Sequence, residues 1–241
     1  MAFRKLLSAL GVGAPEVETV LDSVAVRPGG ELSGTVTVRG GTVDVAVDRL
    51  AVELVVRFEG HGQEARYLHR MAEQVPAAGF TLAAGEVRTE RFAFVLPLTL
   101  PLTHAEGRPL KGAYCAVRTE LAVDNAVDRG DLDEVQVHAL PSQEAVLRSF
   151  AALGFRYEEA EVKPGTAHGS RQDTPWWQEI ELAFPAGYRP GTLELLLQVL
   201  PEELDVRPGT SVPALTLRHE ETADQAALTA RLDAHLRAHF G

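Results

Sequence analysis

Residues 24–58 read VAVRPGGELSGTVTVRGGTVDVAVDRLAVELVVRF, and their side chains alternate between apolar and polar over most of this length. Such alternation indicates β-strands that bury one face. Arg27-Pro28-Gly29-Gly30 predicts a tight turn, because proline presets φ at the first central position and glycine accepts a positive φ at the next. The apolar side chains move from odd to even positions near Asp48-Arg49, which predicts a β-bulge or a strand break there. The stretch is therefore typical of an all-β sandwich, and it carries no chemical motif.

Composition narrows the classes of function. A chain of 241 residues can bury one large core or two smaller ones. Its formal net charge of −11 argues against a nucleic-acid partner, because phosphate contacts need a basic face. The single cysteine, Cys115, excludes an internal disulfide framework and a cysteine-rich zinc site. It lies in a predicted strand, so we expect a buried structural thiol and not a nucleophile.

The first residues predict a short amphipathic helix over residues 3–10. Its apolar side chains are spaced and not continuous, so the segment does not fit a signal peptide. No run in the sequence approaches the ~20 apolar residues of a membrane span. A membrane-surface anchor is disfavoured as well, because the apolar face is small and only Arg4 and Lys5 are basic. We expect this helix to pack against the sandwich in a cytoplasmic protein without membrane association.

Two further helices interrupt the predicted strands. Ser142 is the expected N-cap of a helix over residues 143–153, directly after Leu140-Pro141. Thr222 and Gln225 predict a capping box for a helix that closes the chain. Its apolar stripe recurs every four residues at Leu228, Leu232, Leu236 and Phe240. We therefore expect a β-sandwich over residues 1–138, a linker helix over 139–154 and a β-sandwich with a terminal helix over 155–241.

One turn motif occurs twice. Val26-Arg27-Pro28-Gly29 recurs as Val206-Arg207-Pro208-Gly209, and a strand-like segment follows each copy. Pro-Gly turns are common between strands, so the recurrence has an ordinary explanation. The alternative is a pair of related sandwiches, one in each half of the chain.

An acidic cluster is the strongest candidate site in the sequence. Its carboxylates belong to Asp124, Asp128, Asp131, Asp133 and Glu134. Such a group could hold Ca²⁺, which takes six to eight oxygen ligands, but the order does not fit the EF-hand loop. Arg129 lies inside the cluster and could neutralise part of it. A solvated loop or a salt-bridged linker is the favoured interpretation, and we expect no metal and no cofactor.

Two other groups carry weaker hypotheses. His235 and His239 lie one turn apart on the final predicted helix, but the glutamate that a zinc hydrolase uses as base is missing after the first histidine. Histidines in a last helical turn also suit the helix dipole. Trp176-Trp177 could form a sugar-stacking platform, or one tryptophan could join the core while the other covers an edge or an interface. No nucleophile elbow, P-loop or dinucleotide fingerprint is present in the sequence.

A family resemblance joins these observations. Residues 119–162 read TELAVDNAVDRGDLDEVQVHALPSQEAVLRSFAALGFRYEEAEV, with Asn125-Ala126-Val127-Asp128 before an acidic turn and Leu153-Gly154-Phe155 at the end of a helix. This segment resembles the one that joins the two halves of the stage-zero sporulation-control protein M family. Residues 7–41 resemble the start of that family. The likeness extends to about Leu200 and is lower over residues 210–241.

The resemblance implies an arrestin-like fold, in which a short connector joins two β-sandwiches that bind other proteins and perform no catalysis. In arrestins a buried charge cluster between the lobes sets their relative orientation. By that comparison we expect an interdomain charge cluster at Asp124, Asp128, Arg129, Asp131 and Asp133.

The leading hypothesis is a non-enzymatic, cytoplasmic, arrestin-like regulator or adaptor. Its expected partners are other proteins, with a homodimer as one option, and nucleic acid is not among them. The alternative is a β-sandwich carbohydrate-binding or hydrolase accessory domain that uses Trp176, Trp177 and an acidic pair. A third hypothesis is a metal-dependent enzyme that uses His235, His239 and a distant carboxylate.

Overall fold

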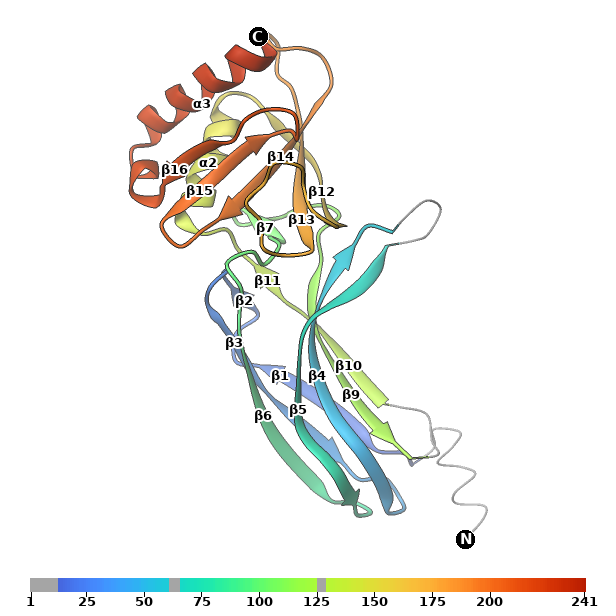
Figure 1. The fold of residues 1–241 in the computed structure, drawn as a ribbon. Coiled ribbons are helices and arrows are strands. Elements are labelled where there is room, and N and C mark those ends of the chain that lie inside the picture. The colour runs from blue at the N-terminus through green and yellow to red at the C-terminus, as the bar shows by residue number, and fades with distance from the viewer. Residues whose placement is uncertain (1–12, 61–65, 125–128) are drawn as a thin grey trace.

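The computed structural model describes residues 13–60, 66–124 and 129–241, which form two lobes (Figure 1). The helix expected at residues 3–10 lies outside the described residues. The described part of the amino-terminal lobe contains strands and no helix, whereas the carboxy-terminal lobe combines a sheet with helices. Among the described helices, none is long and apolar enough to cross a membrane.

Two antiparallel sheets form the amino-terminal lobe. One sheet has the order β1 (Glu16–Leu21), β3 (Glu31–Arg39), β6 (Val87–Val95). The other has the order β10 (Arg129–Glu134), β9 (Cys115–Val123), β4 (Val45–Phe58), β5 (Tyr67–Leu82). Alternate residues of β3, such as Val36 and Val38, face the core with no exposed surface, as their spacing predicts. The two sheets thus make the expected β-sandwich.

Short strand pairs lie where the two lobes meet. β2 (Ala25–Val26) pairs in parallel with β11 (Gln136–Val137), and β7 (His104–Ala105) pairs with β8 (Arg108–Pro109). These strands hold the connecting segments of the lobes together.

Two local predictions from the first strands are confirmed. Gly29 has a φ of 76°, and the Gly30 N–H donates to the Arg27 carbonyl at 3.0 Å, which closes the expected turn. The pairing of β4 with β9 shifts register between Val47 and Arg49, where the apolar alternation changes phase. The bulge allows one strand to keep both apolar sets buried.

One antiparallel sheet and two helices form the carboxy-terminal lobe. The strands follow chain order across the sheet: β12 (Arg156–Pro164), β13 (Trp176–Ala183), β14 (Thr192–Val199), β15 (Glu203–Pro208) and β16 (Leu215–Arg218). The two α-helices are α2 (Pro141–Ala152) and α3 (Gln225–Phe240), and the 3-10 turn η1 (His219–Thr222) precedes α3. The prediction of an all-β chain with short helices is confirmed. In this lobe the second layer consists of helices in place of a second sheet.

The helices begin at residues other than the expected ones. The N-cap of α2 is Leu140, because Pro141 occupies the first helical position, where its fixed φ is favourable. Ser142 is instead buried inside the helix, and its hydroxyl lies 2.9 Å from Nδ1 of His219. The N-cap of α3 is Asp224, whose carboxylate accepts from the N–H groups of Ala226 and Ala227. The predicted caps Ser142 and Thr222 are therefore wrong, although both helices exist.

Helix α2 packs against both the sheet and α3, and most of its side chains are buried. Gln225 of α3 donates its amide to the Ala145 carbonyl at 3.0 Å and to Ser149 Oγ at 2.7 Å. The predicted stripe of α3 is the buried one, since Leu228, Leu232, Leu236 and Phe240 are all at most 7% exposed. Side-chain packing and these bonds fix α3 on α2.

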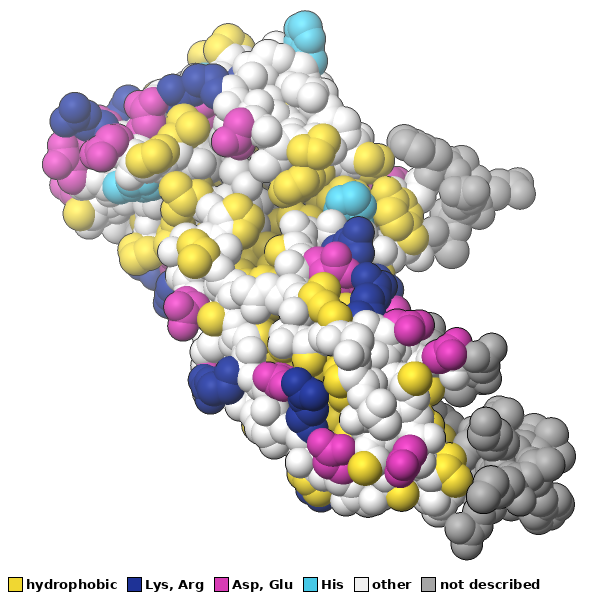
Figure 2. Space-filling view, turned by 60° about the horizontal axis from the view of Figure 1, so that its bottom comes forward, with side chains coloured by type: hydrophobic (Ala, Val, Ile, Leu, Met, Phe, Trp, Pro, Cys, Tyr) yellow, Lys and Arg dark blue, Asp and Glu magenta, His cyan; other side chains and the backbone are white. Residues whose placement is uncertain are grey.

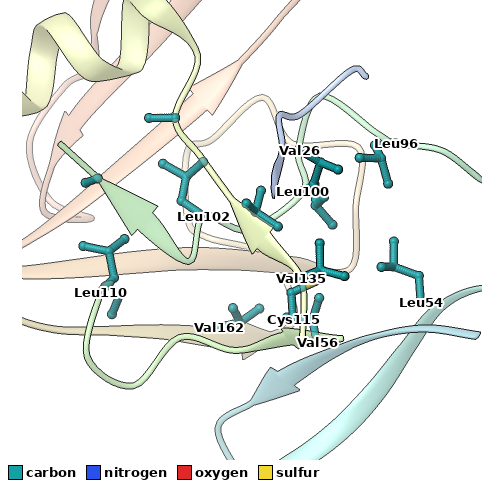
Figure 3. Packing of buried hydrophobic residues seen from close by; sticks show 14 of the residues in the cluster. Val26, Leu54, Val56, Leu96, Leu100, Leu102, Leu110, Cys115, Val135 and Val162 are labelled. Carbon is teal, nitrogen blue, oxygen red and sulfur yellow. The ribbon is translucent and has the colours of Figure 1, made fainter. Parts of the chain in front are cut away.

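The hydrophobic core continues from one lobe into the other. Val162 of β12 belongs to the same buried cluster as Cys115 and Val56 of the amino-terminal lobe, and Figure 3 shows the three side chains together. The Glu59 N–H donates to the Val162 carbonyl at 2.8 Å, which extends this contact through the backbone. The division into domains at residues 138 and 154 stays a prediction, because the lobes share a core.

Candidate functional site at the junction of the lobes

A cleft opens where the amino-terminal lobe meets the sheet of the carboxy-terminal lobe. Residues 98–101 form one wall, and strands β13 and β14 with the loop of residues 165–175 form the others. Its empty volume is about 670 Å³, counting the part that is open to solvent. In the space-filling view, hydrophobic side chains gather at the waist between the lobes (Figure 2).

The cleft lies in a fork between two neighbouring strands. β13 and β14 are paired only from Ile180 opposite Leu195 to Ala183 opposite Thr192. Beyond this point β13 stays paired with β12 as far as Trp176, and β14 stays paired with β15 as far as Val199. The facing edges of the two strands therefore separate, and Trp176–Gln178 and Leu196–Gln198 line the cleft between them.

A glutamine side chain connects the two lobes beside the cleft. Gln178 of β13 donates its amide to the Leu102 carbonyl at 2.7 Å, and its Oε1 accepts the Leu102 N–H at 2.9 Å. The amide thus binds the backbone as a neighbouring strand would. It holds the extended segment LPLTLPLT, residues 96–103, against the sheet of the other lobe, as expected of a connector segment.

The loop of residues 165–175 is held in place by Gln172. Its Oε1 accepts the Ala167 N–H at 2.8 Å and the Ser170 hydroxyl at 2.9 Å, and its amide donates to the Thr174 carbonyl at 2.7 Å. One side chain therefore satisfies several backbone groups of the loop. These bonds fix the shape of this wall of the cleft.

An ion pair closes the loop onto the sheet. Arg171 donates to both carboxylate oxygens of Asp205, each at 2.7 Å, and also pairs with Glu203. Burial would raise the pKa of the Asp205 carboxyl, but hydrogen bonds from Arg171 and Thr216 outweigh it and lower this pKa. Asp205 is thus held as a carboxylate and fully partnered.

The two tryptophans have different surroundings. The Trp176 ring lies 6.3 Å from the rings of both Phe58 and His69, which belong to the amino-terminal lobe. Burial and the nearby Arg70 lower the pKa of His69, so its ring is neutral at pH 7. Trp177 donates its indole N–H to Glu179 at 2.8 Å. Trp176 therefore covers the interface between the lobes, and both tryptophans are among the residues that line the cleft.

Ion pairs between the lobes come from residues that the sequence did not single out. Arg66, directly before β5, pairs with Glu159 and Glu161 of β12. Lys163 pairs with Glu179 in its own lobe and lies 3.6 Å from Glu59 of the other. Glu159, Glu161 and Lys163 alternate along one strand, which marks a charged face in the sequence but does not identify its partner.

The acidic cluster of the sequence lies on and next to β10. Asp131 accepts the Thr19 N–H of β1 at 2.9 Å, and this bond connects the two sheets of the amino-terminal lobe. Asp133 Oδ2 is buried without a hydrogen-bond partner among the described residues, and burial and the neighbouring Asp131 raise its pKa. The Asp124 N–H donates to the Ala46 carbonyl at 3.0 Å.

Among the cluster side chains that the structure describes, no hydrogen bond or ion pair reaches the carboxy-terminal lobe. Asp128 lies outside the described residues, and Arg129 begins β10 opposite Leu121. The hydrogen bonds of Asp124 and Asp131 remain within the amino-terminal lobe. The interdomain role of the cluster stays a prediction.

The other sequence candidates lie in separate parts of the fold. His235 lies 3.1 Å from the Pro213 carbonyl through Nε2, and its ring centroid is 5.1 Å from that of His239. Within residues 13–60, 66–124 and 129–241, no group of three or more His, Cys, Asp or Glu side chains is placed to hold a metal ion. Cys115 is fully buried, as predicted, and burial raises the pKa of its thiol to about 12.

These features define a class: a mostly β, two-lobed protein whose lobes share a core and meet at an apolar cleft. A family model described as SpoOM protein matches residues 3–207. The chain belongs to this family, and the resemblance noted in the sequence is confirmed.

Two individual comparisons agree with the family. The chain is 32% identical over 189 residues to the sporulation-control protein spo0M of Bacillus subtilis strain 168, covering 77% of this chain and 70% of that protein. The crystal structure of the sporulation-control protein Spo0M from Bacillus subtilis superposes with a TM-score of 0.76 at 25% identity, covering 94% of this chain and 99% of that one. The similarity of fold therefore extends over both lobes.

Proposed function

We propose that this chain is a non-enzymatic regulatory protein that controls sporulation or a related process by binding other proteins in the cytoplasm. The observation that carries the proposal is the likeness to a sporulation-control protein over both lobes. The chemistry of the described surface supports it, because the cleft presents apolar and amide side chains and the thiol of Cys115 is buried. Such a surface is suited to recognition.

Complementation tests the regulatory role. A Bacillus subtilis strain without its own spo0M protein would express this chain, and the frequency of heat-resistant spores would be counted. We expect the frequency to move towards that of the parent strain, with the empty vector and the native protein as the two controls. A frequency equal to that of the empty vector, with the chain present at the native protein's level, would contradict the regulatory role.

Crosslinking in the same cells tests the mechanism. We expect mass spectrometry to find the same protein partner in repeated experiments, and ultracentrifugation of the pure chain tests whether a second copy is one of them. If no protein is crosslinked and a small molecule raises the melting temperature of the chain, binding of proteins is not its mechanism.

Carbohydrate binding is the second candidate, because Trp176 and Trp177 both line the cleft. Aromatic rings offer flat apolar faces on which a sugar ring can stack. Isothermal titration of the pure chain with disaccharides tests it. A saturable signal that Trp177→Ala removes would favour this function over protein binding.

A further inference from the structure

We propose that the cleft between β13 and β14 binds an extended, uncharged peptide segment of a partner protein. The proposal rests on the proposed function, since it assigns the surface through which the regulator would recognise its partner. It is argued from strand edges, from two amide groups and from the charge of the walls.

The strand edges provide the first argument. β13 and β14 separate before Ile180 and Leu195, so the pairing between them covers only part of their length. A strand edge without a neighbour offers backbone N–H and C=O groups to another extended chain. Addition of an extended peptide to such an edge is a recurring mode of recognition. On the β13 side the Trp176 carbonyl already accepts from Gln172 at 3.1 Å and from Thr174 at 2.9 Å, so the edge offered to an entering segment is mainly that of β14 beyond Leu195.

Two glutamine amides provide the second argument. Gln143 is only 4% exposed and lines the cleft; its Oε1 accepts the Leu140 N–H at 2.9 Å. Gln198 also lines the cleft, and its Oε1 accepts the Arg171 N–H at 3.0 Å. Neither amide nitrogen has a hydrogen-bond partner within the described part of the chain. Neither nitrogen is buried away from the cleft, so both remain free to donate to carbonyl oxygens of a ligand.

In the same wall of the cleft, one glutamine amide already binds the backbone of an extended segment. The amide of Gln178 binds both backbone groups of Leu102, a residue of an extended segment from the other lobe. Gln143 and Gln198 present the same kind of group to the cleft. A second extended segment would therefore be held as residues 96–103 are held.

The charge of the walls selects the chemistry of the segment. Arg171 is neutralised by Asp205 and Glu203, and Arg207 donates to the carbonyls of Val212 and Gly169. Leucine side chains of residues 98–100 and of β14 form the apolar walls. A charged side chain would lose its hydration there without gaining a partner, so uncharged residues fit best.

Peptide selection on the purified full-length chain tests the proposal. A phage-displayed library of random nine-residue peptides would be panned, and the selected peptides would be measured by fluorescence polarisation. The test variants are Gln143→Glu and Gln198→Glu, since a carboxylate keeps the acceptor for Leu140 or Arg171 and loses the donor. Thr99→Trp is a third variant that narrows the cleft, and it covers the case in which the buried Gln143→Glu variant fails to fold. Gln136→Glu on β11 adds the same charge outside the cleft and is the control.

We expect uncharged, extended consensus peptides whose dissociation constant rises roughly tenfold in each cleft variant and is unchanged in Gln136→Glu. Selection of no peptide, of charged peptides only, or of peptides that bind all variants equally would overturn the proposal. Competition by cellobiose would instead assign the cleft to sugars. If the protein partner crosslinked in cells is still captured by the cleft variants, the proposed function stands and only this site is wrong.

Discussion

One amide side chain adds a specific contact between the lobes to their shared core. Gln178 binds both backbone groups of Leu102, and replacing it with methionine keeps the size of the side chain while leaving a buried N–H and C=O without partners. We expect Gln178→Met to lower the free energy of unfolding by about 1–3 kcal/mol, the usual cost of such groups. Urea denaturation followed by tryptophan fluorescence measures it.

Gln136→Met is the control for this prediction. Its Oε1 lies 3.4 Å from the His138 ring, too far for a strong bond, and the side chain is only half-buried. If both variants lose the same free energy of unfolding, the two hydrogen bonds between Gln178 and Leu102 contribute no specific stability.

A buried carboxylate makes the stability of the amino-terminal lobe depend on pH. Glu53 is 4% exposed; burial would raise its pKa from 4.5, but hydrogen bonds from Arg118 and Arg70 outweigh burial and lower it. A lowered pKa in the folded state means that this stabilisation is complete above about pH 4.5 and is lost as the pH falls through the folded-state value. We expect Glu53→Gln to flatten the fall in unfolding free energy below pH 4.5, as measured by urea titrations at several pH values.

Glu120→Gln is the matched control for the pH prediction. Glu120 lies on the same sheet face, where it pairs with Arg49 at 3.3 Å in a half-exposed position. Exposed ion pairs contribute little, so its pH profile should follow that of the parent protein. If the pH profile of unfolding free energy for Glu53→Gln also follows that of the parent protein, Glu53 is not the group whose protonation lowers the stability.

Residue roles could be predicted from the sequence where the cause is local. The Pro-Gly turn predicts the positive φ of Gly29, and the apolar strand around Cys115 predicts that its thiol is buried. The partner of Gln178 lies 76 residues away in the chain, so no pattern around the glutamine identifies it. Tertiary contacts between polar side chains are therefore the part of the site that the sequence left unpredicted.

At the scale of elements, the start of α3 is set by one carboxylate. Asp224 accepts from the Ala226 and Ala227 N–H groups at 3.1 and 3.0 Å. We expect Asp224→Ala to lower the free energy of unfolding by about 0.5–2 kcal/mol, the usual cost of losing an N-cap. Glu220→Ala is the control, because its ion pair with Arg218 is exposed on both sides. Equal effects in thermal melts of the two variants would argue against Asp224 as the cap.

Asp131 of β10 accepts a backbone hydrogen bond from β1 and so stabilises the position of that strand. Asp131→Ala removes the acceptor of the Thr19 N–H, and we expect a loss of about 1–3 kcal/mol in unfolding free energy. Small-angle scattering of the same variant measures the separation of the lobes. A changed radius of gyration would support an interdomain role for the acidic cluster, whereas an unchanged one would confine its effect to the amino-terminal lobe.

Elements were predicted better than their ends. The stripe of α3 is visible because buried leucines repeat along one helix face. Its start was misplaced, since Thr222 and Asp224 are both good caps and only the packing of η1 decides between them. The helical second layer of the carboxy-terminal lobe was missed because alternation identifies a buried sheet face without identifying what covers it.

At the scale of the whole molecule, the shared core couples the lobes. The sequence predicted two lobes from a helix between two β regions, but it could not show that Val162 packs with Cys115 and Val56 across the boundary (Figure 3). Contact between distant strands depends on how the lobes are placed, and local periodicity does not contain that information. The lobes should therefore unfold as one unit.

The chain contains a reporter for each lobe, which makes this coupling measurable. Both tryptophans lie in the carboxy-terminal lobe, and the single cysteine is buried in the other. Leu182→Ala truncates a fully buried side chain of β13, a strand of the carboxy-terminal lobe, at a cost of about 2–5 kcal/mol. If the molecule is one cooperative unit, the urea midpoint for tryptophan fluorescence and that for thiol labelling of Cys115 fall together. If the lobes are independent, only the fluorescence midpoint falls, and the contact at Val162 is then too weak to transmit a change from one lobe to the other.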